Sequence, residues 1–390
     1  MSKSLVNAIE NLEDYVKKLE TVVNIDSGTT DTQGVTKVAK QFVQWFSDIG
    51  FYAEEVSFDD VVGHGVFATN DKNAEHYDLL LSGHIDTVFA HGTAEERPFK
   101  REVNLAYGPG VADMKDGDLI ILWGLTKALV NGTLEGKKVA VVLNPDEETG
   151  STHSSEFIDS IAKKSDYALI FEGSEEIDNF TEARKGISHI DIFLKGRGAH
   201  AGFCPEKGRS AINAMANCIQ RINALANENV TVNFGVLKGG TIANAIAEDC
   251  YARIDVRFWH NDQWEDFLAK FKHEFEIPFG QDIQASFKIL LVNPAMVVTE
   301  KTAKLKEIVT KALTKFSITP KFIRSGGVSD GNHISNTGTP VLDTFGGRGG
   351  ECHTTREWLD LTSVEPRAEL LVEILKQLLP SQKIAKPETI

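Results

Sequence analysis

The sequence has few cysteines, no long apolar run and no excess of basic residues, and each shortage argues against a class of protein. The four cysteines form no CxxC pair and no spacing typical of a disulfide framework, so we expect reduced thiols in a cytoplasmic enzyme. The absence of any run of about 18 apolar residues argues against a membrane span or a membrane partner. Lysine and arginine total 41 against 56 acidic residues, and a net charge of −15 repels phosphate backbones, so we expect no nucleic-acid partner.

The first part of the chain alternates predicted helices with predicted buried strands. The amphipathic stretch at residues 5–23 carries charges that the apolar core of a signal peptide lacks, so we interpret it as a helix. Strands that alternate with helices predict an α/β domain with a mostly parallel sheet flanked by helices. The predicted elements are helices over 5–23, 33–49 and 117–130 and strands over 77–81, 138–143 and 166–171.

The pattern changes after residue 185, where the predicted order becomes βαββαβ. This order is typical of a compact α+β unit, and the α/β pattern returns after Pro294. A chain of 390 residues is long enough for two domains. We therefore predict one discontinuous domain, 1–185 with 294–390, and an inserted second domain over 186–293. The final ten residues, 381–390, are predicted to form a loose tail.

A histidine and an aspartate follow the first predicted buried strand, in the run SGHIDTV at 82–88. His84 falls at the carboxyl end of that strand, where open α/β sheets bind their ligands. Residues i and i+2 of a strand lie on one side, so Asp86 can accept the second N–H of the His84 ring and orient it. An isolated pair of this kind is more often part of a polar turn, so other residues must support a metal site.

Carboxylates follow the next segments in the same way. In YGPGVADMKDG at 107–117, glycines allow close backbone approach, and Asp113 precedes a predicted helix. In NPDEETGS at 144–151, Glu147 and Glu148 follow a buried strand, where one could bind a metal while the other takes a proton from water. Taken alone, Asp113 would be a helix N-cap, and the glutamates would be an acidic helix start.

Two further candidates complete the set. Glu172 follows the strand at 166–171, and His353 lies after a glycine-rich loop, in ECHTT at 351–355. Each is weak alone, but the carboxyl ends of parallel strands meet at one edge of a sheet. Zinc accepts histidine nitrogen and carboxylate oxygen, so two histidines and three carboxylates suffice for two zinc ions that share one carboxylate.

Taken together, these runs resemble the M20 metallopeptidases, and they are most similar to the glutamate carboxypeptidase (carboxypeptidase G) branch. Three runs in the inserted segment also resemble motifs of that family: GRGAHAG at 196–202, GGTIAN at 239–244 and IDVR at 254–257. The resemblance spans nearly the whole chain in the family's order. It implies a zinc-exopeptidase-like catalytic domain with an inserted lid and dimerisation domain.

The resemblance also implies a role for each candidate residue. His84 and Glu172 would hold one zinc ion, Glu148 and His353 would hold the other, and Asp113 would bridge both. Relatives carry a cis peptide after the bridging aspartate, which here precedes Met114. Glu147 would be the general base, Asp86 would orient His84, and His200 would stabilise the tetrahedral oxyanion. Asn244 and Arg257 would hold a substrate carboxylate, and Arg324 is a further candidate for substrate contact.

These roles predict a hydrolase with two zinc ions that cleaves an amide bond beside a free carboxylate, as a carboxypeptidase or dipeptidase does. The substrate would be a small peptide or an N-acyl amino acid, and glutamate is one candidate product. In the glutamate carboxypeptidases an arginine precedes the proline at the lid's end, whereas this chain has Asn293, so a preference for glutamate is in question. Co²⁺ or Mn²⁺ would also suit these ligands, and the family implies a homodimer formed through the lid.

Three other interpretations compete with this one. An N-acyl-amino-acid deacylase, of the acetylornithine deacetylase or aminoacylase type, would use the same metal ligands. A catalytically inactive binding protein would have lost a ligand or the base, and none is missing here. A nucleotide-binding enzyme would need a phosphate loop, and the glycines at 346–350 lack the strand and helix context of one.

Overall fold

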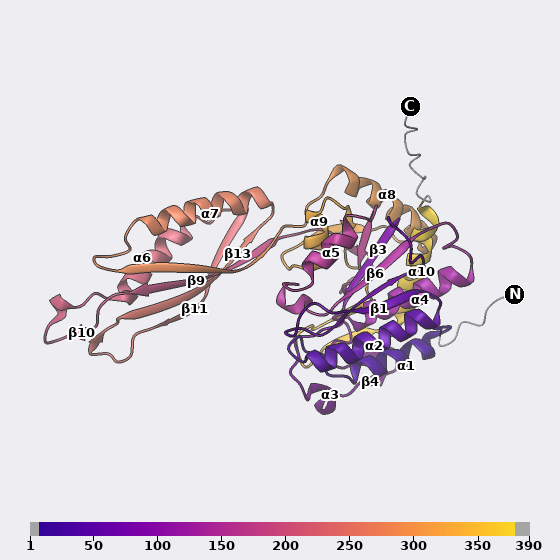
Figure 1. The fold of residues 1–390 in the computed structure, drawn as a ribbon, viewed down its shortest axis with the longest axis horizontal. Helices are drawn as coiled ribbons and strands as arrows, with labels where there is room; N and C mark the ends of the chain where they lie inside the picture. Colours follow the sequence, from indigo (N-terminus) through magenta and orange to yellow (C-terminus); the bar gives the residue numbers. More distant parts are fainter. Residues whose placement is uncertain (1–7, 379–390) are drawn as a thin grey trace. The chain divides into compact units, whose positions relative to one another are not determined.

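The computed structural model describes residues 8–378, and the chain divides into two compact units (Figure 1). Unit one comprises Met1–Ala183, Val298–Arg324 and Ser329–Ile390, and unit two comprises Arg184–Val297 and Ser325–Val328. The predicted tail at 381–390 and the first residues of the predicted helix at 5–23 lie outside the described residues.

Unit one is built on a six-stranded mixed sheet. Strands β6, β3, β7 and β16 run parallel, whereas β1 pairs with β2, and β2 with β6, in antiparallel fashion. The sheet confirms the predicted α/β class. In spatial order the strands are β1 (Tyr52–Val56), β2 (Gly65–Thr69), β6 (Val139–Asn144), β3 (Leu79–His84), β7 (Ala168–Ile170) and β16 (Val341–Leu342).

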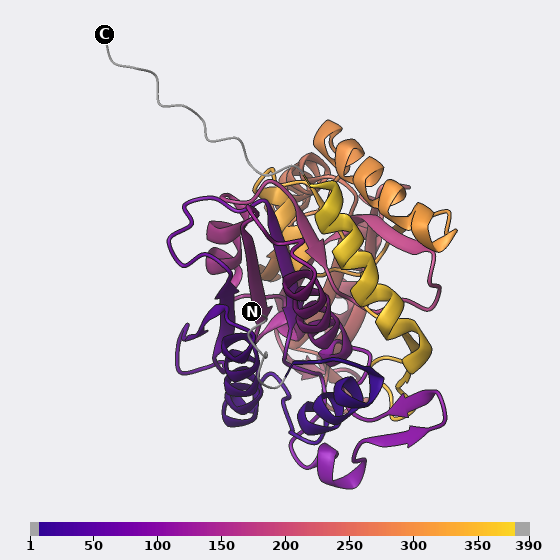
Figure 2. The ribbon, with the colours of Figure 1, turned by 90° about the vertical axis from the view of Figure 1, so that its right-hand side faces the viewer.

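Helices pack on this sheet and bury its apolar strands. Helix α4 packs on β3, and α10, the yellow helix in Figure 2, packs along α4. Within residues 8–378, no helix is long and apolar enough to cross a membrane. The helices of unit one are α1 (Leu12–Val23), α2 (Thr32–Asp48), α3 (Thr93–Glu96), α4 (Lys115–Val130), α5 (Ser155–Ala162), α8 (Glu300–Leu313), α9 (Asp330–Asn336) and α10 (Leu361–Gln377).

Capping residues explain where the first and last helices begin. Helix α1 begins at Leu12, later than the predicted residue 5, because the side chain of Asn11 accepts the N–H groups of Glu13 and Asp14. Helix α10 begins after Asp360, whose carboxylate accepts the N–H of Thr362. Each cap satisfies donors that have no partner within the helix.

Two small sheets complete unit one. One has the order β17-β18-β5-β4, so it brings the chain near residue 350 beside the chain near residue 107. The other pairs β15 with β8. Their strands are β4 (Lys100–Glu102), β5 (Leu105–Tyr107), β8 (Asn179–Arg184), β15 (Lys321–Ser325), β17 (Arg348–Gly350) and β18 (Trp358–Asp360).

Unit two is an antiparallel sheet of order β11-β13-β9-β14, with α6 and α7 packed on one face. Ile190 and Ile192 face the helices and are buried, whereas Asp191 between them faces the other side and binds Arg253 at 2.7 Å. The elements run in the predicted βαββαβ order. They are β9 (Gly186–Lys195), α6 (Ala211–Asn223), β11 (Val230–Gly239), β13 (Asp249–Phe258), α7 (Asn261–Glu276) and β14 (Gln284–Asn293), with a short pair of β10 (Ala199–His200) and β12 (Ala245–Ile246).

Candidate active site

The predicted site residues of unit one gather at the carboxyl ends of the parallel strands. His84 is the last residue of β3 and lies in register with Asn144, the last residue of β6. Glu147 and Glu148 form a short 3₁₀ turn after β6, and Glu172 lies two residues beyond the end of β7. Because neighbouring parallel strands end side by side, side chains far apart in the sequence share one edge of the sheet.

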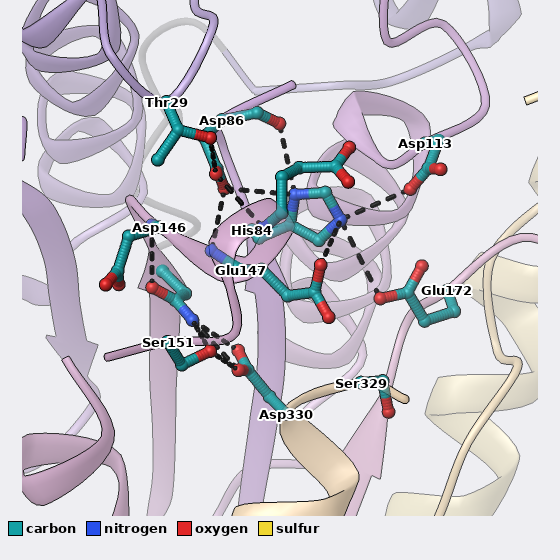
Figure 3. A network of polar contacts seen from close by, with 12 residues as sticks. Thr29, His84, Asp86, Asp113, Asp146, Glu147, Ser151, Glu172, Ser329 and Asp330 are labelled. Carbon is teal, nitrogen blue, oxygen red and sulfur yellow. Dashed lines mark hydrogen bonds and ion pairs between the residues drawn. The ribbon is translucent and has the colours of Figure 1, made fainter. Parts of the chain in front are cut away.

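Asp113 lies between the two histidines (Figure 3 shows its contact with His84). Its Oδ1 is 3.2 Å from Nε2 of His84, and its Oδ2 is 3.0 Å from Nε2 of His353. On one side, His84 Nε2 is 3.7 Å from Glu172, and on the other, His353 Nε2 is 3.3 Å from Glu148. Asp113 makes no side-chain cap on α4, and its peptide bond to Met114 is cis.

These contacts define two groups of potential metal ligands that share Asp113. One group is His84, Asp113 and Glu172, and the other is Asp113, Glu148 and His353. The donor atoms in each group lie within 4.8 Å of one another. Imidazole nitrogen and carboxylate oxygen are ligands that zinc accepts.

The electrostatics of the two groups also fit cations. The buried Oε1 of Glu148 has no hydrogen-bond partner among the described residues, so an acceptor is held out of water with nothing bound to it. Hydrogen bonds with Asp113 and Glu148 raise the pKa of His353 to about 10. Burial acts to lower the pKa of His84, but hydrogen bonds with Asp113 and Asp86 raise it well above its usual value. The carboxylates thus attract positive charge, which a divalent cation would supply.

Asp86 holds three parts of the site together. Nδ1 of His84 lies 3.1 Å from the carbonyl oxygen of Asp86 and 3.3 Å from its carboxylate. The same carboxylate accepts the N–H groups of Glu147 and Glu148 at 3.1 and 3.2 Å, and the hydroxyl of Thr29 donates to it at 2.7 Å. Asp86 therefore orients the imidazole and also fixes the turn that carries the two glutamates.

Glu147 faces the ring of His84 and lies in neither ligand group (Figure 3). Its Oε2 is 4.0 Å from Nε2 of His84. Burial raises the pKa of Glu147 well above its ordinary value, and the negative charge of Glu172 contributes to the shift. A carboxyl group whose pKa is raised in this way is suited to accept and return a proton near neutral pH.

The loop that carries Asp113 is held by Glu357, whose role the sequence did not indicate. The buried carboxylate of Glu357 accepts the N–H groups of Gly110, Ala112 and Asp113 at 2.9, 2.8 and 3.1 Å. Sequence reasoning also missed Thr29. Both residues act on backbone or on another carboxylate, and no local pattern marks such contacts. The only signal for Glu357 is its position four residues after His353.

The other predicted site residues lie on unit two or at its border. Nδ1 of His200 accepts the N–H groups of Gly202 and Phe203 at 3.2 and 3.1 Å. The guanidinium of Arg257 binds the carboxylate of Asp255 through Nε and Nη2. Asn244 is exposed between β11 and β12, and Arg324 lies on β15.

Comparison with known proteins agrees with this arrangement. The family model described as Peptidase family M20/M25/M40 matches residues 80–377. Carboxypeptidase G2 from Pseudomonas sp. is 29% identical over 93% of this chain and 89% of its own length. Acetylornithine deacetylase from Vibrio parahaemolyticus is 29% identical over 58% of this chain and 62% of its own length. The crystal structure of aminopeptidase PepT from Bacillus cereus has the same fold, with a TM-score of 0.79 at 23% identity, covering 94% of this chain and 99% of that one.

The fold, the site and these similarities define a metal-dependent hydrolase of the exopeptidase and amidohydrolase class. More narrowly, the chain belongs to peptidase family M20/M25/M40.

Proposed function

We propose that this protein is a two-metal hydrolase that cleaves an amide bond beside a free carboxylate, as carboxypeptidases and dipeptidases do. The observation that carries the proposal is the pair of ligand groups that share Asp113, with Glu147 beside them. Carboxypeptidase G2, a relative that this chain matches over nearly its whole length, supports the carboxypeptidase type.

In this proposal, His84 and Glu172 would hold one cation, Glu148 and His353 would hold the other, and Asp113 would belong to both ligand groups. Zinc is the expected metal, and Co²⁺ or Mn²⁺ would suit the same ligands. When bound, two such cations polarise a carbonyl group and lower the pKa of water. A relative of known structure, the YXEP protein of Bacillus subtilis, is a dinuclear metal-binding peptidase of the M20 family, which supports a site for two metals.

Glu147 acts as the general base. It takes a proton from the attacking water at its carboxylate and passes that proton to the nitrogen of the leaving amine. Its backbone is fixed by the carboxylate of Asp86, and its side chain is only 12% exposed, so few solvent molecules compete for the proton. Its raised pKa favours a carboxylate basic enough for this transfer.

His200 stabilises the oxyanion that forms on the substrate carbonyl. Because Nδ1 of His200 accepts two backbone N–H groups, the ring proton of the neutral side chain is on Nε2. This nitrogen is then a donor for an oxyanion. Unit two, which spans the predicted lid, would thus supply His200 to catalysis.

A substrate carboxylate would be bound by Asn244 and Arg257, with Arg324 as a further contact. Two of the guanidinium nitrogens of Arg257 already bind Asp255, and its Nη1 donates to the carbonyl of Gly326 at 3.1 Å. These bonds hold the guanidinium in one orientation, and binding the substrate would require it to share or exchange partners.

The proposal does not extend to a preference for glutamate. Asn293 is only 3% exposed at the end of β14, and it offers an amide where the glutamate carboxypeptidases carry an arginine. The second candidate is an N-acyl-amino-acid deacylase, which the similarity to acetylornithine deacetylases favours. Both reactions break the same type of bond and would use the same metal ligands.

The test is release of amino acids from a substrate panel by the zinc-loaded protein. The panel contains C-terminal dipeptides, N-acyl glutamates and N-acetyl amino acids, and Glu147→Ala is the control. Zinc-dependent release that is lost in the control would support the hydrolase and would separate peptidase from deacylase. Equal release by Glu147→Ala would contradict the general-base role.

We also propose that the protein is a homodimer formed through unit two. Strand β11 is at the edge of the sheet of that unit, and its apolar residues Val236 and Leu237 are 38% and 56% exposed. An edge strand with exposed apolar side chains is suited to pair with another strand.

A further inference from the structure

A buried carboxylate outside both ligand groups contacts the loop that carries Glu147 and Glu148. Asp330 begins α9, and it is 2% exposed. Its two oxygens each lie 2.9 Å from Nδ2 of Asn144, and the hydroxyl of Ser151 donates to Oδ1 at 2.5 Å. Figure 3 shows Asp330 beside Ser151, below Glu147.

Asn144 and Ser151 are the two ends of this loop. Asn144 is the last residue of β6, and Ser151 leaves the turn with a positive φ of 54°. Nδ2 of Asn144 also donates to the hydroxyl of Ser151 at 2.8 Å. Asp330 therefore binds both ends of the loop at once.

A second carboxylate, that of Asp86, binds the middle of the same loop. The carboxylate of Asp86 accepts the N–H groups of Glu147 and Glu148. Asp86 at the centre of the loop and Asp330 at its ends thus both constrain the two glutamates. The hydroxyl of Ser154, which donates to Asn144 and Asp146, supports the same loop. Asp86 contacts His84 directly, whereas Asp330 contacts Asn144 and Ser151. Besides burial, the negative charge of Asp330 also contributes to the raised pKa of Glu147.

The chemistry of these contacts favours a carboxylate at position 330, because both of its oxygens accept hydrogen bonds. Asn144 presents an N–H group to both oxygens of Asp330, and Ser151 donates its hydroxyl proton. An asparagine at 330 would carry an NH2 group in place of one carboxylate oxygen. That NH2 group would face the NH2 group of Asn144, so two donors would meet without an acceptor. Because all three side chains are buried, water cannot replace the lost acceptor without rearrangement.

We propose that Asp330 is a positioning residue for this metal centre. By binding Asn144 and Ser151, it fixes the turn that carries Glu148, which would hold a cation, and Glu147, the proposed general base. This inference rests on the proposed two-metal function. Some residues hydrogen-bond to metal ligands without binding the metal themselves. Their replacement typically lowers metal affinity or activity by about 10–100-fold.

The decisive experiment compares Asp330→Asn with the exchanged pair Asn144→Asp/Asp330→Asn. Zinc affinity is measured by calorimetry against a competing chelator, and kcat and KM are measured for the substrate found in the panel. We expect Asp330→Asn to weaken the binding of one of the two zinc ions roughly 10-fold or more and to lower kcat more than KM changes. The exchanged pair restores one donor facing one acceptor, so we expect it to recover most of the zinc affinity.

Ser329→Ala is the matched control. In the wild type, the hydroxyl of Ser329 accepts the N–H of Gly331 at the start of α9 and donates to Asp343 at 2.6 Å. Neither partner belongs to the loop that carries Glu147 and Glu148. We expect a lower Tm for this variant and zinc affinity equal to the wild type. A loss of zinc affinity in Ser329→Ala as large as in Asp330→Asn would mean that general destabilisation of α9 is the cause, and it would overturn the inference.

Two other results would also overturn it. One is wild-type zinc affinity and kcat in Asp330→Asn, and the other is an exchanged pair that melts like the wild type and still binds zinc weakly. If Asp330→Asn alone does not fold, the zinc affinity of the exchanged pair tests the inference instead. The zinc measurements need no substrate, so a wild-type protein that binds two zinc ions but hydrolyses nothing would contradict the proposed function and leave this test intact.

Discussion

At the scale of single residues, the raised pKa values of His84 and His353 bear on the proposed binding of metal. The pKa of His353 is raised to about 10, so this ring is protonated at pH 7 without metal. Burial acts to lower the pKa of His84, but hydrogen bonds with Asp113 and Asp86 raise it above its usual value. A cation binds only the deprotonated ring nitrogen. Metal binding at pH 7 should therefore release protons, and affinity should increase with pH until the raised pKa values are passed.

We expect proton release when zinc binds at pH 7, with about one proton from His353, whose pKa is raised to about 10. Calorimetric titration in two buffers of different ionisation enthalpy measures this number directly. His353→Ala should release about one proton fewer. Zinc binding without any proton release would show that His353 is not a ligand.

His200 allows a second prediction at this scale. Removal of one oxyanion donor typically lowers kcat by about 10²–10³-fold. We expect His200→Ala to lose about that much turnover while its zinc content stays at the wild-type value. The control is His273→Ala, which removes an exposed histidine from α7 of the same unit. An unchanged kcat in His200→Ala would contradict the proposed role of His200 in stabilising the oxyanion.

The residues that were predicted from the sequence and those that were missed differ in what they bind. His84 is the last residue of β3, and Glu148 and Glu172 lie just beyond β6 and β7, so the fold class predicts that they share one edge of the sheet. Glu357 binds backbone N–H groups of a loop that lies about 245 residues away in the sequence. Such a contact exists only after folding has brought the two segments together, and no spacing in the chain reports it.

At the scale of elements, the close approach of α4 to the end of β7 sets the geometry of the site. A Cβ atom on Gly117 of α4 would lie 2.0 Å from the carbonyl oxygen of Phe171, the residue before Glu172. Only glycine allows the helix that follows Asp113 to lie so close to the chain that carries Glu172.

We expect Gly117→Ala to lower the free energy of unfolding by roughly 1–3 kcal/mol, because the added methyl group meets backbone that cannot turn away. It should also weaken zinc binding, because α4 and Glu172 are pushed apart. Thermal denaturation and zinc titration check both effects. Gly124→Ala is the control on the same helix, where the nearest atom, at 2.7 Å, is the end of the Leu371 side chain. Wild-type zinc affinity in Gly117→Ala would contradict this account of the packing.

Most of the predicted elements have a clear apolar run or period, and even the three-residue strand β7 was predicted because its segment is apolar. Strands β1 and β2 were not predicted. β1 carries the adjacent charges Glu54 and Glu55 and is only partly buried, and β2 is a five-residue run without alternation. The three-residue strands β4, β5 and β17 are shorter still. Such strands form because a partner strand is present, so their own residues carry little signal.

At the scale of the whole molecule, the dimer proposal depends on the edge strand of unit two. If β11 pairs with a second copy, a charge placed on its exposed apolar surface should disrupt the pairing. We expect Leu237→Lys to shift the protein from dimer to monomer in sedimentation velocity. Val103→Lys places the same charge on unit one at an apolar residue that is 84% exposed, and it should leave the dimer intact. A wild-type protein that sediments as a monomer would contradict the proposal.

The sequence predicts an inserted domain over 186–293 because the order of the predicted elements becomes βαββαβ after residue 185. The two compact units of the structure place their borders near 184 and 297, and unit two also includes Ser325–Val328. That short segment pairs with unit two through contacts such as the one between Lys185 and Ser325. A local pattern cannot show that a segment from beyond the insertion returns to it.

The most direct test of the whole account is the number and place of the bound metals. Diffraction from zinc-loaded crystals at the zinc absorption edge would locate them without any assumption about substrate. The account predicts two anomalous peaks about 3.5–4 Å apart, one at His84 and Glu172 and the other at Glu148 and His353, with Asp113 bound to both. A single peak, or two peaks that do not share Asp113, would contradict it.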